Sequence, residues 1–425
     1  FFFTDIILLE NVNVIKERRA INYMQIGFAR TKIDPKIPCH LEGYQDRMAQ
    51  GYYSHLYMNT IYIQANKNIL FHVLDVVIIE KKLYEDIKQF ILDNLDVDID
   101  YIFISAIHTH SGPKVSHKID KEIVLDDEYL QSLKKAALLN TKEAILNKQE
   151  ARTFLSVLPI ENLYSNRNGI NKPFFNQAYL LSFCNLNGDS IVDLVNLACH
   201  PTILKGENCM VSSDYVGYMR ECYELKTGIP LCFFNAEAGD VSTRLVKQGE
   251  GIEECKRVGE AIAHQLTNAK KEREILLDKM VINSIRYKNH YYPNIDDFIV
   301  EMRHKLDYPD KYFKKNDQRY FMSERLKQSL DRKLAENIIY LDYEAFVVEF
   351  NDIYIVTIPG ELVYQLAKKI RQKTKKDIIL FCYTNDYFGY AINMEDYGLY
   401  FESYESEFRQ GEAEKFINKI IQYIQ

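Results

Sequence analysis

The chain has 425 residues, of which 47% are hydrophobic, and its formal net charge is -7. This length suffices for a large buried core, and the acidic balance excludes the basic footprint that is typical of nucleic-acid-binding proteins. The sequence contains no stretch of the roughly 18 consecutive apolar residues that a transmembrane helix requires.

The eight cysteines indicate the compartment. They form no CxxC pair, so a metal- or disulfide-rich scaffold is not favoured, and buried thiols in a reducing compartment are expected. The N-terminal segment 1–19 is apolar but contains Asp5 and Glu10, and it lacks a basic start and a cleavage site. We expect a cytoplasmic protein; the alternative is a secreted protein whose upstream signal peptide was removed. Four thiols lie within or at the ends of apolar runs: Cys184, Cys199, Cys232 and Cys382.

In chain order, the first predicted elements are two strands and a helix. The apolar runs 59–64 and 68–80 flank Ala65 to Lys67 and predict a hairpin. Residues 83–95 have apolar side chains spaced three and four apart, which indicates an amphipathic helix. The same spacing predicts four further helices at 127–147, 251–272, 359–374 and 412–424. Strands that alternate with helices favour the α/β class, with a mixed sheet flanked by helices.

The segment at about 289–337 differs from the rest of the chain. It is strongly charged, carries many aromatic residues and has a helical pattern. We interpret it as a helical insertion that leaves the main sheet and lies beside a site. The alternative is a solvated insertion without a functional role.

Polar side chains end five of the apolar runs. Ligand sites in open α/β sheets gather at the carboxyl ends of strands, so these five ends predict a shared cleft. The pair His108 and His110 would point to one side of a strand. Such a pair suits two metal ligands, one ligand and one catalytic base, or two structural histidines. The five runs end at His108 and His110, at His200, at Ser242, at Glu361, and at Asn385, Tyr387 and Tyr390.

Two histidines from different strands, a glutamate and an oxygen ligand suit a catalytic zinc site. Such an ion would lower the pKa of its water toward ~7 and polarise a carbonyl, which is the chemistry of amide or ester hydrolysis. The sequence contains neither a G-x-S-x-G elbow nor a Walker A loop, so the familiar serine-hydrolase and nucleotide-binding functions lose support.

Six short segments of the sequence, taken together and in order, resemble the motifs of a known enzyme family. "HTHSGP", "NLACHPT", "SSDYVGY", "NAEAGDVS", "IPGEL" and "NDYFGYAINMEDY" occur in this order, after the opening segment "GFARTKIDPKIPCHLEGYQDR". Together they resemble the catalytic domain of the neutral/alkaline (non-lysosomal) ceramidases, from about residue 25 to 408. The resemblance implies that residues 1–425 form a single catalytic domain, without the immunoglobulin-like C-terminal domain of the long ceramidases.

The resemblance also implies one zinc ion per chain. The family holds this ion with two histidines, a glutamate and a tyrosine. The matching positions are His108 of His-Thr-His, His200 of His-Pro, Glu361 of Pro-Gly-Glu and Tyr390, the second tyrosine of Asn-x-Tyr-x-x-Tyr. The alternatives are a core histidine for His108, a helix N-terminal carboxylate for Glu361 and a packing role for Tyr390.

Further pocket residues follow from the same resemblance. His110 is implied near the reacting carbonyl, where it would move protons as base and then acid. Arg167 matches a pocket arginine, and Ser242 matches a serine that the family associates with catalysis. Ser242 would position water or substrate; action as a covalent nucleophile is the less favoured version. Gly43 matches the Gly-Tyr turn that borders the pocket.

The sequence departs from the family pattern at the edge of the pocket. The family has a further tyrosine at a fixed distance after the segment that matches Glu395-Asp396-Tyr397, and in this sequence that position holds Glu402. Tyr404 is the equivalent if two residues are inserted, and Tyr400 is its rival; Tyr404 or Arg167 would stabilise the oxyanion. Asn168 replaces the serine that follows the family's arginine.

These observations predict a zinc-dependent amidohydrolase that cleaves a small-molecule or lipid N-acyl amide, as ceramidases do, and does not bind nucleic acid. One alternative keeps the zinc site but acts on an acylated amino acid, a peptide or a lactam. Another is a metal- or lipid-binding homologue without turnover. The sequence does not determine the oligomeric state.

Overall fold

The computed structural model describes residues 24–119 and 123–425, so segment 1–19 lies outside the described residues. Its largest sheet has the strand order β13-β11-β10-β8-β1-β5-β6-β7, and β15 pairs with β8. The pairs β6–β7 and β11–β13 are parallel and the others are antiparallel, so the sheet is mixed, as predicted. The strands are β1 (Gln25–Lys32), β5 (Tyr57–Gln64), β6 (Asn68–Leu74), β7 (Tyr101–Ala106), β8 (Gln149–Pro159), β10 (Gln177–Asn185), β11 (Ser190–Leu197), β13 (Leu231–Asn235) and β15 (Arg273–Ile275).

A second mixed sheet has the order β16-β17-β18-β20. Only β18 and β20 run parallel in it. Its strands are β16 (Val281–Tyr291), β17 (Ile339–Glu349), β18 (Ile353–Thr357) and β20 (Asp377–Phe381). The prediction of a mixed-sheet α/β core is confirmed, and the structure divides that core between two sheets.

The two sheets pack face to face around a common apolar layer. Side chains alternate between the faces of a strand. In β18, Ile355 therefore joins the layer between the sheets, whereas Val356 faces the outer side. Aromatic rings connect the sheets: the ring centroids of Phe71 and Phe381 lie 5.4 Å apart. This central layer holds the strand ends of both sheets in a constant relative position.

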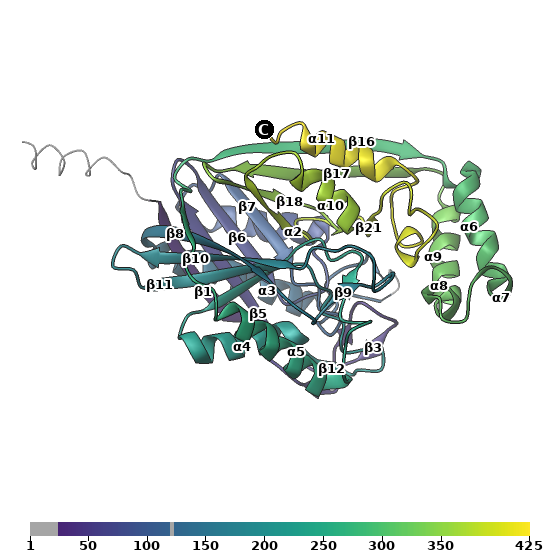
Figure 1. Cartoon of the computed structure of the whole chain (residues 1–425), viewed down its shortest axis with the longest axis horizontal. Helices are drawn as coiled ribbons and strands as arrows, with labels where there is room; N and C mark the ends of the chain where they lie inside the picture. The colour runs from purple at the N-terminus through teal and green to yellow at the C-terminus, as the bar shows by residue number, and fades with distance from the viewer. Residues whose placement is uncertain (1–23, 120–122) are drawn as a thin grey trace, which may run out of the picture.

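Helices cover the outer faces of both sheets, so the layers follow the order helix, sheet, sheet, helix (Figure 1). Helix α2 (Lys81–Asp93) packs on α3 (Asp127–Leu146), which contacts β1 and β5. Helices α10 (Tyr364–Arg371) and α11 (Glu412–Ile421) cover the second sheet, and α4 (Tyr215–Thr227) and α5 (Gly251–Leu266) form a pair beside β13. The hairpin predicted at Ala65 to Lys67 is present as β5 and β6.

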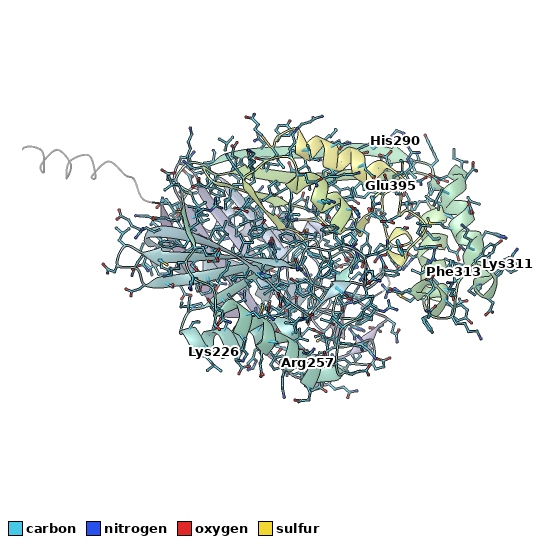
Figure 2. All side chains as sticks on the ribbon, in the orientation of Figure 1. Lys226, Arg257, His290, Lys311, Phe313 and Glu395 are labelled. Carbon is cyan, nitrogen blue, oxygen red and sulfur yellow. The ribbon has the colours of Figure 1, made fainter. Side chains whose placement is uncertain are left out.

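The predicted helical insertion is confirmed between β16 and β17. It contains a short 3-10 turn, η2 (Pro293–Ile295), and helices α6 (Asp297–Asp307), α7 (Pro309–Tyr312), α8 (Gln318–Phe321) and α9 (Ser323–Ala335). The side chain of Asp296 caps α6 by accepting the backbone N–H groups of Phe298 and Ile299. Figure 1 shows these helices beyond one end of the sheets, and the labelled side chain of Lys311 lies at their outer edge (Figure 2).

The short elements near the strand ends shape the loops of the site. They are β2 (His40–Leu41), β3 (Arg47–Met48), β4 (Gly51–Tyr52), β9 (Ser165–Asn166), β12 (Met210–Val211), β14 (Val241–Ser242), β19 (Glu361–Leu362), β21 (Tyr390–Ala391) and η3 (Phe401–Ser403). All eight cysteines are free thiols, and the four that were expected in the core are buried. No helix within residues 24–119 and 123–425 has the length and hydropathy needed to cross a membrane.

Candidate functional site

Two strand ends of the large sheet deliver the first two histidines. His108 follows β7 and His200 follows β11. Between them, the side-chain amide of Asn235, at the end of β13, donates hydrogen bonds to the carbonyl oxygens of Ile107 and Cys199 at 3.1 and 3.3 Å. These are the residues immediately before the two histidines, so Asn235 holds both strand ends in one arrangement.

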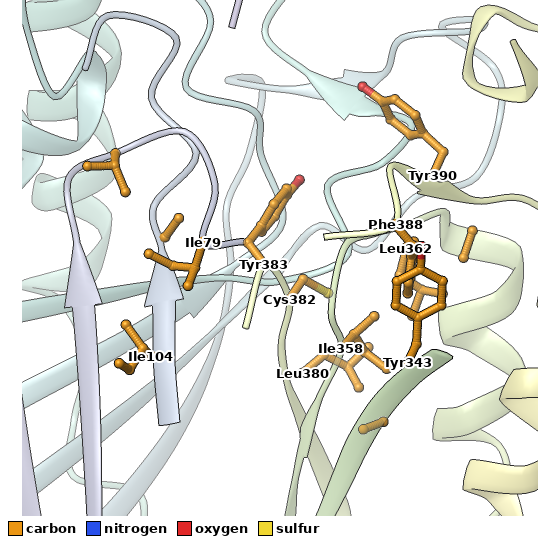
Figure 3. Close-up of a cluster of buried hydrophobic side chains, with 14 of the residues drawn as sticks. Ile79, Ile104, Tyr343, Ile358, Leu362, Leu380, Cys382, Tyr383, Phe388 and Tyr390 are labelled. Atoms are coloured by element: carbon orange, nitrogen blue, oxygen red, sulfur yellow. The ribbon is translucent and has the colours of Figure 1, made fainter. Parts of the chain in front are cut away.

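Glu361 and Tyr390 lie on the short two-stranded sheet of β19 and β21, in loops that follow β18 and β20 of the second sheet. Strands β19 and β21 run parallel, and Glu361 is the direct register partner of Tyr390. Partners in register share a face of the pair. Figure 3 shows that the labelled side chain of Tyr390 projects away from the apolar cluster around Leu362 and Phe388. The β19–β21 pair therefore places a carboxylate and a phenol side by side.

The side chains of His108, His200 and Glu361 meet at one buried point. Their potential ligand atoms lie within 4.8 Å of one another. The Nε2 atoms of His108 and His200 lie 3.3 and 2.8 Å from the two carboxylate oxygens of Glu361. Each of the three side chains is only 1% exposed to solvent.

Hydrogen bonds on the far side of each ring set the orientation of the imidazoles. Nδ1 of His108 lies 2.7 Å from the carbonyl oxygen of Val77, and Nδ1 of His200 lies 2.6 Å from that of Ala238. A ring that donates from Nδ1 presents a lone pair at Nε2. Among the residues that the structure describes, the buried Nε2 of His200 and Oε2 of Glu361 have no hydrogen-bond partner. Three acceptors that face one another without a proton between them fit a divalent cation.

Burial and charge act in opposite directions at this centre. Burial by itself would raise the pKa of the Glu361 carboxyl, but the imidazoles of His108 and His200 hold it well below its usual range. Burial and the positive charge of Arg167 lower the pKa of His200. A carboxylate and neutral imidazoles are the forms that bind metal.

His110 stands next to the candidate ligands. Its Nε2 lies 3.2 Å from Nε2 of His108, and its buried Nδ1 has no hydrogen-bond partner within residues 24–119 and 123–425. The ring packs on Tyr44, with 4.8 Å between the ring centroids. Burial lowers the pKa of His110 well below its usual value, and the neighbouring imidazoles of His108 and His200 lower it further. Gly43 lies against the same ring, because a Cβ atom built on it would come within 2.5 Å of His110 Cγ.

Ser242 is buried beside His200, with which it forms an isolated parallel bridge. Within residues 24–119 and 123–425, the only hydrogen bond of its hydroxyl is the one it accepts from the backbone N–H of Arg244 at 3.3 Å. The hydroxyl hydrogen is therefore free to bond a ligand. A serine nucleophile needs an adjacent base, so this arrangement favours positioning over nucleophilic attack.

Arg167 forms a buried pair that the sequence did not indicate. Its Nε lies 2.8 Å from Oε1 of Glu402, and Nδ2 of Asn168 donates to the other oxygen of Glu402 at 3.1 Å. Both departures from the family pattern, Asn168 and Glu402, thus contact each other. The guanidinium carbon lies 5.4 Å from the ring centroid of Tyr390, and Nη2 has no hydrogen-bond partner in the described part of the chain.

Of the two rival tyrosines, Tyr404 lines the cavity. It is fully buried, and its hydroxyl has no hydrogen-bond partner of good geometry among the described residues. Burial raises the pKa of Tyr404, and the positive charge of Arg319 opposes that rise. Tyr400 does not line the cavity, and the ammonium of Lys172 lies 4.2 Å from its ring centroid. Tyr387 is a contact that the sequence did not assign: its hydroxyl donates to Oε1 of Glu361 at 2.5 Å.

One cavity of about 970 Å³ joins these groups. Its volume lies within the range of pockets for small molecules. Loops that follow strands of the large sheet, the β19–β21 pair and the helical insertion all contribute to its wall. All nine residues predicted from the sequence line it: Gly43, His108, His110, Arg167, His200, Ser242, Glu361, Tyr390 and Tyr404.

No family model matches the chain. Its fold is similar to that of the neutral ceramidase from Pseudomonas aeruginosa, with a TM-score of 0.76 and 14% sequence identity over 94% of this chain and 73% of that chain. A structure described as a ceramidase complexed with C2 has a TM-score of 0.73 and 13% identity, over 93% of this chain and 74% of that chain. The similarity confirms, at the level of the fold, the resemblance carried by the ordered motifs.

Proposed function

We propose that the protein is a zinc-dependent amidohydrolase that cleaves N-acyl amide bonds, as ceramidases do. The observation that carries this proposal is the buried convergence of His108, His200 and Glu361 in a cavity of substrate size. The ceramidase fold and the register of Tyr390 next to Glu361 support it. In this proposal, Tyr390 completes the ligand set.

When bound, the zinc ion supplies an acidified water and a Lewis acid for the amide carbonyl. The residues around it act on the substrate directly. His110 accepts a proton and returns it to the leaving amine, because its ring adjoins the candidate ligands and has an unpartnered buried nitrogen. Ser242 orients the substrate through its free hydroxyl hydrogen.

Two donors suit the oxyanion of the tetrahedral intermediate. The Tyr404 hydroxyl and Nη2 of Arg167 are buried and have no hydrogen-bond partner of good geometry within the described residues. Donors that are already held in place do not need to reorganise as charge develops on the carbonyl oxygen. Glu402 holds the guanidinium in position through the Nε–H group.

The proposal is tested with Glu361→Gln and His200→Ala, and with His264→Ala as the control. His264 is exposed and contacts Lys226 far from the cavity. Metal content would be measured by mass spectrometry, together with hydrolysis of N-lauroyl amides. We expect one zinc ion and turnover in the wild type and the control, and the loss of both in the site variants. Full turnover by a metal-free variant would refute the proposal. Bound zinc without hydrolysis of any amide would instead favour a non-catalytic binding protein.

A further inference from the structure

Helix α9 of the insertion forms part of the cavity wall with one of its faces. The buried side chains of Leu326 and Leu330, which lie beside this face, anchor the helix in the apolar core. Residues spaced three and four apart share a face of a helix. The side chains that line the cavity have this spacing, and three of the five are basic: Met322, Arg325, Ser329, Arg332 and Lys333.

The cavity as a whole carries the opposite charge to the protein. The chain has a net charge of -7, yet its cavity is lined by eight lysines and arginines and four glutamates. Five of the eight cations have a carboxylate within 4 Å, and the catalytic arginine candidate is among them. The paired cations are Lys118, Arg167, Lys205, Lys247 and Arg325.

Three cations of the lining have no such partner in the part of the chain that the structure describes: Arg244, Arg332 and Lys333. Lys333 donates one hydrogen bond from Nζ to the carbonyl oxygen of Ser406 at 2.5 Å, which leaves two N–H groups of its ammonium unused. Arg244 donates from Nη1 to the side-chain oxygen of Gln318. These neutral acceptors do not balance the charges.

Lys333 is the most constrained of the three. Burial lowers its pKa to about 8, against the opposing attraction of Glu407 and Glu405. The ammonium is therefore still largely protonated at neutral pH. Desolvation of a cation is costly. No carboxylate of the described residues comes within 4 Å of this ammonium, so an anion that a ligand brings into direct contact with it would reduce that cost.

We propose that the natural substrate is an N-acyl amide that carries an anionic group, a carboxylate or a phosphate, bound by Arg332 and Lys333, with Arg244 in the lining of the same cavity. This inference rests on the proposed function and names its substrate class. A neutral amino-alcohol headgroup would leave all three cations unpaired. Charge-assisted hydrogen bonds from arginine and lysine are the usual means of holding carboxylates and phosphates.

The first test compares three probes with the same acyl chain: N-lauroylglycine, N-lauroyl-phosphoethanolamine and N-lauroylethanolamine. We expect the wild type to have a higher kcat/KM for at least one anionic probe than for the neutral one. In Arg332→Gln/Lys333→Gln, the ratio of anionic to neutral kcat/KM should fall by about ten- to a hundredfold. The preference should also weaken as the salt concentration rises.

A charge-matched control is Lys311→Gln/Lys327→Gln. Lys311 is exposed on the outer side of the insertion, and Lys327 pairs with Asp307 on α6, outside the cavity lining. This variant also loses two positive charges, but it should retain the wild-type ratio. A merely structural role of Arg332 and Lys333 would lower kcat/KM for all three probes by the same factor, which would overturn the inference.

A binding measurement separates failure of this inference from failure of the proposed function. Calorimetric titration of the full chain with N-lauroylglycine, N-lauroyl-phosphoethanolamine and N-lauroylethanolamine needs no turnover. Tighter binding of an anionic probe, lost in Arg332→Gln/Lys333→Gln, supports the anion site even if no amide is hydrolysed. Hydrolysis of the neutral probe with equal or tighter binding of that probe would overturn the anion site and leave the amidohydrolase proposal intact.

Discussion

Gly43→Ala gives a sharp test of the position of His110. Gly43 has φ +108°, and a Cβ atom there would lie 2.5 Å from Cγ and 2.6 Å from Nδ1 of His110. Non-bonded carbon atoms prefer separations of about 3.5–4.0 Å. The imidazole must therefore move by about 1 Å to relieve this contact. In addition, the backbone of Gly43 is in a region of φ that disfavours any residue with a side chain.

The size of the effect follows from this displacement. A misplacement of about 1 Å at a catalytic group can cost about a hundredfold in rate. We therefore expect kcat of Gly43→Ala to fall by about this factor. The strained backbone adds a destabilisation of about 1–3 kcal/mol, which is small enough for the folded protein to be assayed at 25 °C if the wild type has ordinary stability.

The assay measures kcat on an N-lauroyl amide together with zinc content. Gly206→Ala is the matched control, because a Cβ atom there would meet Tyr44 at an ordinary 3.7 Å. Zinc should remain bound in both variants, and only Gly43→Ala should be slow. Wild-type kcat in Gly43→Ala, or an equal loss in both variants, would refute the reasoning.

Three further predictions concern buried charges. Arg220→Met leaves Asp75 buried without its partner, and urea unfolding should show a loss of about 3–5 kcal/mol; an unchanged midpoint would contradict this. His72 is buried and burial lowers its pKa to about 3, so folding favours its neutral form. The stability that it contributes is complete above pH 6.5 and should fall by about 2 kcal/mol at pH 5 relative to His72→Gln; parallel curves would argue against it. Glu402→Gln removes the counter-charge of Arg167, and steady-state kinetics should show kcat lowered about ten- to a hundredfold with bound zinc retained; a change in KM alone would exclude the positioning role.

Local sequence patterns predicted most helices and strands, because apolar spacing and end caps involve residues that are close together in the chain. The apolar spacing at 127–147 corresponds to α3 (Asp127–Leu146), whose start is set by the side chain of Asp126 capping the N–H of Tyr129. The helix predicted at 359–374 starts only at Tyr364. The residues before it form β19, which exists because it pairs with β21, and a window confined to one segment contains no trace of that pairing.

The sequence did not predict the roles of residues whose contacts come from distant segments of the chain. Glu402 marked a break in the family spacing, and the structure places it against Arg167 and Asn168. Asn235 lies in a quoted motif, but its role depends on carbonyl oxygens at two other strand ends. In a sequence, an asparagine or glutamate looks the same whether it binds a residue of the site or faces solvent. Its role therefore becomes visible only from its neighbours in the structure.

The sequence alone determined which residue types end the apolar runs, because alternation along a strand decides which side chains leave the core together. The ordered motifs also identified the nine candidate residues. Only the tertiary structure decided that they share a cavity, that Tyr404 rather than Tyr400 lines it, and that a basic face of α9 forms part of its wall. These facts depend on pairings between distant segments, and the free energy of such pairings resides in contacts that no single stretch of sequence contains.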